Sequence, residues 1–152
     1  METKPRQYRV QKYRLNIVKE KPGDYDRVTI SKRNDVKEFC EKFLHDWPIE
    51  HVVIIALNGA NKIIGFQAVE GEPNQCALYP SAVFRFLLCA GACSFIVAHN
   101  HPGGSVSISG ADWAITEKLY AASKPLDVKF LDHIIIADNT FISLRDHPKW
   151  PK

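Results

Sequence analysis

Two histidines one residue apart, His99 and His101, follow an apolar run, and Ser109 and Asp112 come after them with the spacing Ser-x-x-Asp. Imidazole nitrogens and carboxylate oxygens are both common zinc ligands. Residues i and i+2 of an extended segment point to the same side, so we expect the two imidazoles to converge. The spacing therefore predicts a metal site formed by His99, His101 and Asp112. Three protein ligands would leave a fourth position open, as in catalytic zinc sites.

The Ser-x-x-Asp pair also has a purely structural interpretation. Ser109 can cap a helix, and Asp112 can complete a capping box and interact favourably with the helix dipole. Capping does not explain two imidazoles at the end of the apolar run 95–98, because burying them without a bound partner is unfavourable. The residues therefore favour the metal site, although a His-x-His pair alone is a weak signal.

Hydrophobic periodicity predicts the elements that position these residues. Residues 94–99 form a short buried strand ending at His99, and residues 111–123 have helical spacing, which puts Asp112 on the first turn of a helix. Apolar runs at 51–57 and 63–69 flank an Asn-Gly pair that tolerates the positive φ angles of a tight turn, so we expect a hairpin there.

The rest of the chain alternates in the same way. Residues 13–18 alternate as a half-buried strand, and a helix is expected from an N-cap at Asn34 until Pro48 stops the pattern. Residues 81–92 are apolar nearly all round, which predicts a helix buried on most sides and closed by Gly91. A last hairpin is expected over residues 128–144, with its bend at 138–139. This order of elements predicts an α/β domain with a mixed central β-sheet flanked by helices.

Composition sets the class of protein. A chain of 152 residues, 45% of them hydrophobic and 24% charged, fits one ordinary globular domain. It has no apolar run long enough to cross a bilayer and no secretory leader, so we expect a cytoplasmic protein without membrane association.

The chain has four cysteines, which are Cys40, Cys76, Cys89 and Cys93. They form no C-x-x-C pair, so we expect buried free thiols, with Cys89 and Cys93 one turn apart on a helix.

Charge is concentrated at the start of the chain. Residues 1–21 carry a net charge of +5, which leaves −2 for the remainder of the total +3. We expect two parts: a basic arm over residues 1–21, forming an edge strand of the same domain, and the main domain over residues 22–152. The arm could contact nucleic acid or another acidic partner weakly, with Tyr8 and Tyr13 stacking on bases. A solvated basic strand is the preferred interpretation.

The sequence HNHPGG followed by SISGAD resembles the JAMM motif of the JAB/MPN metalloprotease superfamily. AHNHP and the later LDHIII are similar to its RadC-like branch, whose members are historically labelled DNA-repair proteins. The resemblance runs from Glu50 to Leu144. It implies a single JAB/MPN-type α/β domain that hydrolyses peptide or isopeptide substrates, with zinc (Zn²⁺) held by His99, His101 and Asp112. It further implies that Ser109 stabilises the oxyanion of the substrate.

The sequence departs from this family at one position. The resemblance implies a glutamate on an earlier strand as general base, and the alignment of residues 61–80 puts Gln67 there. An amide cannot accept a proton from water, so base catalysis, typically worth ~10² to 10⁴-fold, would be lost. Glu70 is the next candidate, although strand parity places it opposite residue 67, and Glu72 is a weaker one.

Two hypotheses therefore stay open. The chain is either a zinc-dependent amide hydrolase with an uncertain base, or a non-catalytic metal-binding module that serves as a partner-associated or nucleic-acid-associated accessory protein. RadC-like proteins often carry a helix-hairpin-helix domain before the JAB domain. We expect no room for one here, which would weaken autonomous DNA binding. His133 is expected to be a satisfied core histidine, with support of the metal ligands as the alternative, and Asp132 a strand-end partner or a surface group.

Overall fold

The computed structural model describes residues 28–44, 49–70, 78–137 and 140–152. Several expectations concern residues outside these ranges: the basic arm, the strand at 13–18, the helix stop at Pro48, Glu72, Cys76 and the bend at 138–139. The elements follow in the order α1 (Arg33–Leu44), β1 (His51–Leu57), β2 (Ile63–Glu70), α2 (Pro80–Ala90), β3 (Ser94–Asn100), α3 (Gly110–Ser123), β4 (Lys129–Ala137), β5 (Thr140–Ser143) and a short 3-10 helix, η1 (Leu144–Asp146).

The strands form one mixed five-stranded sheet in the order β2-β1-β3-β4-β5. The β3–β4 pair is parallel, and the β1–β2, β1–β3 and β4–β5 pairs are antiparallel. A parallel pair needs a long crossover connection, which α3 provides. β3 is central and buried along its whole length, so its carboxyl end can deliver polar side chains into a protected place.

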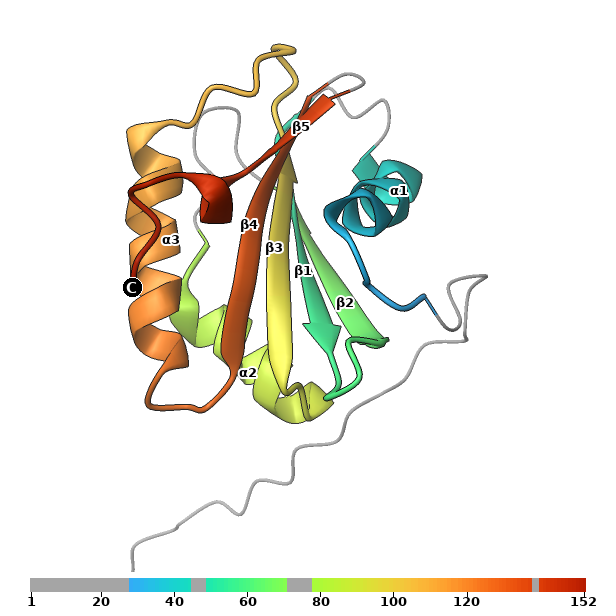
Figure 1. Cartoon of the computed structure of the whole chain (residues 1–152), viewed down its shortest axis with the longest axis vertical. Helices are drawn as coiled ribbons and strands as arrows, with labels where there is room; N and C mark the ends of the chain where they lie inside the picture. Colours follow the sequence, from blue (N-terminus) through green and yellow to red (C-terminus); the bar gives the residue numbers. More distant parts are fainter. Residues whose placement is uncertain (1–27, 45–48, 71–77, 138–139) are drawn as a thin grey trace, which may run out of the picture.

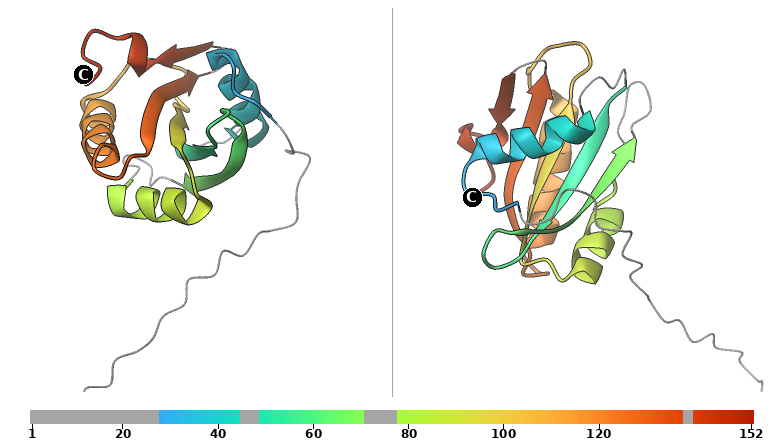
Figure 2. Two further views of the ribbon diagram at one scale, coloured as in Figure 1. Left: turned by 60° about the horizontal axis from the view of Figure 1, so that its bottom comes forward. Right: turned by 90° about the vertical axis from the view of Figure 1, so that its right-hand side faces the viewer.

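Helices cover both faces of the sheet, with α1 on one side and α2 and α3 on the other (Figures 1 and 2). Two apolar clusters fill the two interfaces. Beneath α1, Val36, Phe39 and Cys40 pack on alternate residues of the strands. This architecture confirms the predicted α/β domain with a mixed sheet flanked by helices.

The start of α1 differs from its prediction. Asn34 lies inside the helix, which begins at Arg33, so it is not the N-cap. The carboxylate of Asp35 instead accepts hydrogen bonds from the backbone N–H groups of Ser31 and Lys32 at 2.8 and 2.9 Å. Several polar residues in a row can each cap a helix, and periodicity alone does not choose among them.

The β1–β2 hairpin is present, but its turn differs in detail. The residue with positive φ is Asn61, at 56°, and not the Asn58-Gly59 pair. The side-chain oxygen of Asn58 accepts hydrogen bonds from the N–H groups of Ala60 and Lys62. Asn58 thus shapes the loop through its side chain, which is the other common role of asparagine in turns.

The second helix is less buried than predicted. Gly91 closes α2 in the left-handed conformation, at φ 69°, which confirms its expected role. Leu88 is nevertheless 52% exposed, so the apolar surface of this helix is only partly covered. Cys93 lies beyond the helix and is exposed, Cys89 is half-buried and Cys40 is buried. The expectation of uniformly buried thiols, with Cys89 and Cys93 stacked on one helix, was therefore wrong.

Candidate metal centre

His99 is held at the carboxyl end of the central strand. It pairs in register with Val52 of β1 and Ile135 of β4, and it is 2% exposed. Its side chain has the parity of Val97, which belongs to the apolar cluster beneath α2 and α3. The imidazole therefore points toward the helix that follows β3 in the chain.

His101 lies just beyond the strand but continues its course. Its backbone N–H donates to the carbonyl of Ile136 at 2.9 Å, which keeps the segment extended. The Nε2 atoms of His99 and His101 lie 2.9 Å apart, so the predicted convergence is observed. The chain then turns at Gly104, where φ is 73°, and the Nδ1 atom of His101 lies 2.7 Å from the carbonyl oxygen of Ser105.

Asp112 arrives on the first turn of α3, and it both caps the helix and faces the histidines. Oδ2 accepts a hydrogen bond from the N–H of Ser109 at 2.7 Å, and the Ser109 hydroxyl oxygen accepts from the N–H of Asp112 at 3.1 Å. Oδ1 lies 3.1 Å from His99 Nε2, and Oδ2 lies 3.8 Å from His101 Nε2. The capping box and the proposed ligand set therefore use the same carboxylate and do not exclude each other.

These three side chains can hold a metal ion. Their ligand atoms lie within 4.8 Å of one another. Among the described residues, these three form the group of His, Cys, Asp or Glu side chains that could hold a metal ion. Tetrahedral zinc with bonds of about 2.0 to 2.2 Å would separate its ligand atoms by about 3.3 to 3.6 Å. The distances of 2.9, 3.1 and 3.8 Å bracket that value. His101 also fits, because a carbonyl oxygen facing Nδ1 requires the proton there and leaves the Nε2 lone pair toward the centre.

The chain is similar to known proteins over most of its length. Residues 30–149 match the RadC-like JAB domain family. The chain belongs to the RadC-like JAB domain family. It is 35% identical over 127 residues to a UPF0758 protein of Clostridium perfringens, covering 83% of this chain and 56% of that protein. A UPF0758 protein of Bacillus licheniformis is 35% identical over 122 residues, covering 80% and 54%, and one of Staphylococcus epidermidis is 37% identical over 122 residues, covering 79% and 54%. The chain thus spans about half the length of these relatives.

The electrostatics of the RadC-like domain favour an ionised Asp112. Burial acts to raise the pKa of this carboxyl, but the adjacent His99 imidazole, when it is protonated, and the hydrogen bonds from Ser109 outweigh burial and lower the pKa below its ordinary value. An ionised carboxylate is the form that binds a metal.

His133 and Thr116 form a second layer behind the ligands. His133 is 1% exposed, and its Nε2 lies 2.9 Å from His99 Nδ1. Its Nδ1 lies 2.7 Å from the Thr116 hydroxyl oxygen, and that hydroxyl donates to the carbonyl of Asp112 at 2.6 Å. Burial lowers the pKa of His133 well below its ordinary value. His133 is therefore a partnered core histidine that also contacts a candidate ligand, whereas sequence reasoning missed Thr116.

A bulge in β4 directs the side chain of His133 toward His99. The register against β3 shifts after Phe130, so Phe130 packs beneath α3 whereas Asp132 shares the α1 face with Ile134. Regular alternation would put residues 130, 132 and 134 on one face. The extra residue, Leu131, re-aims the strand and lets His133 face His99.

Gln67 lies on β2 and shares a face of the sheet with the ligands. Gln67 pairs with Ile54 of β1, and Ile54 pairs with Val97 of β3. Val97 and His99 are two residues apart on β3, so their side chains lie on the same face of the sheet. Gln67 is exposed and lies two strands from His99. An amide at this position therefore faces the same side of the sheet as the candidate metal centre.

Glu70 occupies a different register position. It pairs with His51, which has the parity of Val53 in the cluster beneath α1. Residue 70 is thus out of parity with residue 67, as strand alternation predicts. The register favours position 67 over position 70, and the catalytic roles of both remain predictions.

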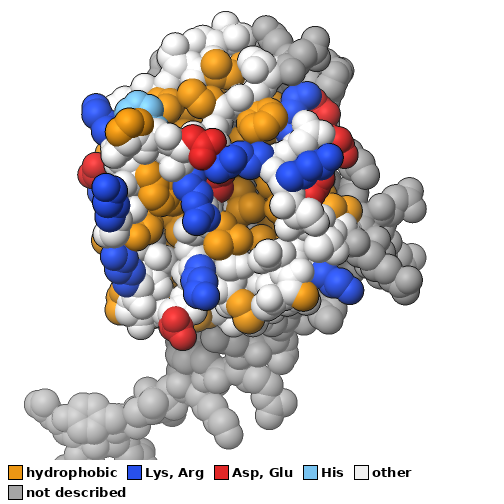
Figure 3. Space-filling model, in the orientation of Figure 1, with side chains coloured by type: hydrophobic (Ala, Val, Ile, Leu, Met, Phe, Trp, Pro, Cys, Tyr) orange, Lys and Arg blue, Asp and Glu red, His pale blue; other side chains and the backbone are white. Residues whose placement is uncertain are grey.

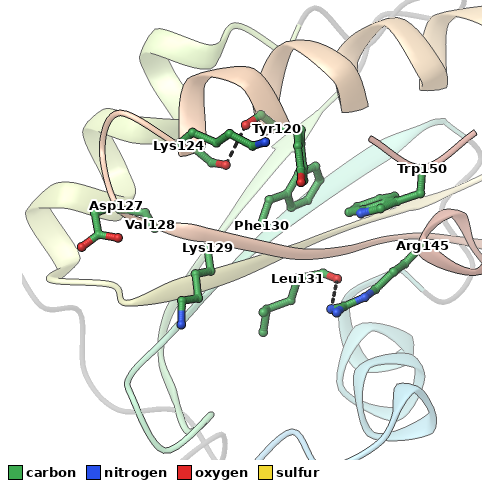
Figure 4. Close-up of a pocket in the computed structure, with 10 residues that line it drawn as sticks. Tyr120, Lys124, Asp127, Val128, Lys129, Phe130, Leu131, Arg145 and Trp150 are labelled. Atoms are coloured by element: carbon green, nitrogen blue, oxygen red, sulfur yellow. Dashed lines mark hydrogen bonds between the residues drawn. The ribbon is translucent and has the colours of Figure 1, made fainter. Parts of the chain in front are cut away.

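A separate hollow of about 430 Å³ lies at the other end of α3. Tyr120, Phe130 and Trp150 pack together there, and Lys124 sits 4.6 Å from the centre of the Tyr120 ring (Figure 4). Lys and Arg side chains are scattered over the face shown in Figure 3, with apolar side chains between them. None of the candidate ligands lines this hollow, so the metal centre stands apart from it.

Proposed function

We propose that this RadC-like JAB domain is a zinc-dependent hydrolase of amide or isopeptide bonds. The observation that carries the proposal is the convergence of the His99 and His101 Nε2 atoms with the Asp112 carboxylate at distances suited to one ion. Two imidazoles and one carboxylate form a three-ligand set of the kind that leaves a position open in catalytic zinc sites. Bound zinc would polarise a scissile carbonyl and lower the pKa of a water molecule.

The protein's own residues would orient the substrate and hold its developing charge. The Ser109 side chain is exposed, and its oxygen already accepts a hydrogen bond from the backbone N–H of Asp112. Its hydroxyl hydrogen can therefore be donated to the oxyanion of a substrate amide. Removing one such donor typically costs about 10² to 10³-fold in rate.

Gln67 limits proton transfer in this proposal. It faces the ligand side of the sheet but cannot take a proton from water, so we expect slow turnover in the natural sequence. Gln67→Glu should raise the rate of peptide or isopeptide hydrolysis by about 10² to 10⁴-fold. The matched control is Ala68→Glu, which adds the same charge on the neighbouring, exposed position of opposite parity.

The test uses the zinc-loaded full chain with a broad library of peptides and isopeptides. We expect weak hydrolysis that His101→Ala abolishes, a gain with Gln67→Glu and no gain with Ala68→Glu. Elemental analysis of the same samples identifies the metal, because two histidines and one carboxylate also suit iron(II). Hydrolysis that survives His101→Ala, or a protein that selects iron over zinc, contradicts the proposal.

Gln67 also favours a second candidate function. In this alternative, the domain keeps the metal but serves as a non-catalytic module that associates with a protein or nucleic acid. It predicts stoichiometric zinc without turnover on any library member, and no gain in hydrolysis with Gln67→Glu.

The charge of residues 1–21 supplies a specific form of that alternative. Their net charge of +5 suits contact with phosphates. Single-stranded DNA should then bind with an affinity that falls steeply with salt and disappears when residues 1–21 are removed. Equal DNA affinity with and without residues 1–21 would contradict it.

A further inference from the structure

A continuous hydrogen-bonded chain runs from the backbone of α3 to the candidate ligand His99. It starts at the carbonyl oxygen of Asp112, continues through the Thr116 hydroxyl at 2.6 Å and His133 Nδ1 at 2.7 Å, and ends with His133 Nε2 at 2.9 Å from His99 Nδ1. Thr116 is 0% exposed and His133 is 1% exposed, so water does not replace these contacts.

The direction of every bond follows from the first acceptor. A carbonyl oxygen can only accept, so the Thr116 hydroxyl hydrogen lies on the contact with Asp112. The Thr116 oxygen must then accept from His133, which places the proton of His133 on Nδ1. A neutral imidazole carries one N–H, so His133 Nε2 has a lone pair and accepts from Nδ1–H of His99.

The opposite direction is unfavourable for two reasons. If the Thr116 hydroxyl donated to His133 instead, two oxygen atoms would face each other at 2.6 Å with no hydrogen between them. If His133 carried both protons, a cation would be buried on a side chain that is 1% exposed, which is unfavourable. Both alternatives would place the proton of a neutral His99 on Nε2, where it blocks a metal.

We propose that Thr116 and His133 are positioning residues that fix the tautomer of His99, so that its Nε2 lone pair faces the cation before the cation binds. The inference rests on the metal site of the proposed function but not on hydrolysis. His101 follows the same rule by a shorter path, because its Nδ1 faces the carbonyl of Ser105 directly at 2.7 Å. In both ligands, a backbone carbonyl determines which nitrogen is free.

The tautomers can be measured in the metal-free full chain. At about pH 9, well above the ordinary imidazole pKa, long-range proton–nitrogen NMR correlations show which ring nitrogen carries the proton. We expect the proton on Nδ1 in both His99 and His133. A proton on Nε2 of His99 in the natural sequence would overturn the proposal.

A matched pair of variants tests the role of the hydroxyl. Thr116→Val keeps the shape but removes the acceptor for His133 Nδ1–H, so the His133 proton should move to Nε2 and that of His99 to Nε2. Zinc affinity, measured by competition with a chromogenic chelator, should then fall by about 10 to 100-fold. Thr116→Ser keeps the hydroxyl and should retain both the tautomers and the affinity.

Equal zinc affinities of the Val and Ser variants would contradict the positioning role. Failure of the proposed hydrolysis would leave these NMR and affinity results unchanged. If the tautomer prediction fails, the zinc stoichiometry and the peptide assay can still decide the proposed function. The two proposals can therefore fail separately.

Discussion

Two buried polar clusters lie on opposite faces of the sheet, around neighbouring residues of β4. On the α1 face, Asp132 is 5% exposed and accepts from the hydroxyl of Ser143, the N–H groups of His133 and Arg145, and the guanidinium of Arg33. The expectation that Asp132 lies at a strand end or on the surface was therefore wrong. On the α3 face, His133 contacts His99, whose Nε2 atom converges with possible ligand atoms of His101 and Asp112.

The difference lies in the balance of donors and acceptors. Each oxygen of Asp132 has donors, and the charge of Arg33 offsets its own, which describes a closed structural cluster. In the other cluster, the tautomers inferred for His99 and His101 leave two nitrogen lone pairs 2.9 Å apart beside a carboxylate. Buried acceptors without donors are costly unless a cation binds them, so the excess of acceptors distinguishes a binding site from a structural cluster.

The largest expected effect comes from changing each carboxylate to an amide. Asp112→Asn should weaken zinc affinity by about 100-fold or more, because the site loses a charged ligand. Asp132→Asn, the matched change on the other face, should leave zinc affinity nearly unchanged. Chelator competition measures both affinities, and a similar loss in the two variants would erase the distinction between the clusters.

The same Asp132→Asn variant should have the larger effect on folding. It removes the charge that holds Arg33 and replaces two acceptor oxygens with one, so the free energy of unfolding should fall by about 2 kcal/mol. Asp146→Asn is the control, because Asp146 binds the same guanidinium but its side chain is 63% exposed. Urea denaturation compares them, and equal losses would show that Asp132 is no more important than a surface charge.

Ser109→Ala should cost less, because it removes one cap of α3. We expect a loss of about 1 kcal/mol in the free energy of unfolding, with zinc affinity reduced less than in Asp112→Asn. Ser107→Ala, in the exposed loop before the helix, should change stability little. Zinc affinity that falls as far as in Asp112→Asn would instead indicate that Ser109 is itself a ligand.

The smallest effect is a pH dependence of the closed cluster. Burial is the largest influence on Asp132 and raises its pKa above the ordinary 3.8 despite its hydrogen bonds. A raised native pKa means that the contribution to stability is fully present below the unfolded pKa and is lost as pH rises through the native pKa. The difference in the free energy of unfolding between the natural chain and Asp132→Asn should therefore decrease as the pH rises from the unfolded pKa of Asp132 through its native pKa. A difference that grows with pH in urea denaturation would contradict this sign.

The sequence predicts the candidate metal centre, the polar cluster on the α3 face, well. His-x-His after an apolar strand and Ser-x-x-Asp at a helix start determine local geometry through strand and helix periodicity, and the structure brings the three candidate ligands together. The main helices and strands of the described residues follow from the same periodicity. The sequence left metal binding and capping as alternatives for Asp112, whereas one carboxylate does both.

What the sequence could not predict depends on contacts between distant elements. The direction of Asp132 and His133 is set by the bulge at Leu131, which has no clear signal in the local sequence KFLDH. Thr116 follows Asp112 by one helical turn, a spacing that could have suggested it, but its partner His133 is brought there only by the sheet. The exposure of Leu88 similarly depends on how α2 packs, because an apolar sequence does not show which side stays uncovered.

Among the residues that the structure describes, none of the helices could span a membrane.

Anomalous scattering at the zinc edge, from crystals of the full chain grown after incubation with zinc, tests the central claim most directly. We predict one strong peak within about 2.0 to 2.2 Å of the Nε2 atoms of His99 and His101 and of an Asp112 carboxylate oxygen. A zinc-soaked crystal with no peak there, or with the imidazoles bonded through a different nitrogen, would contradict the account.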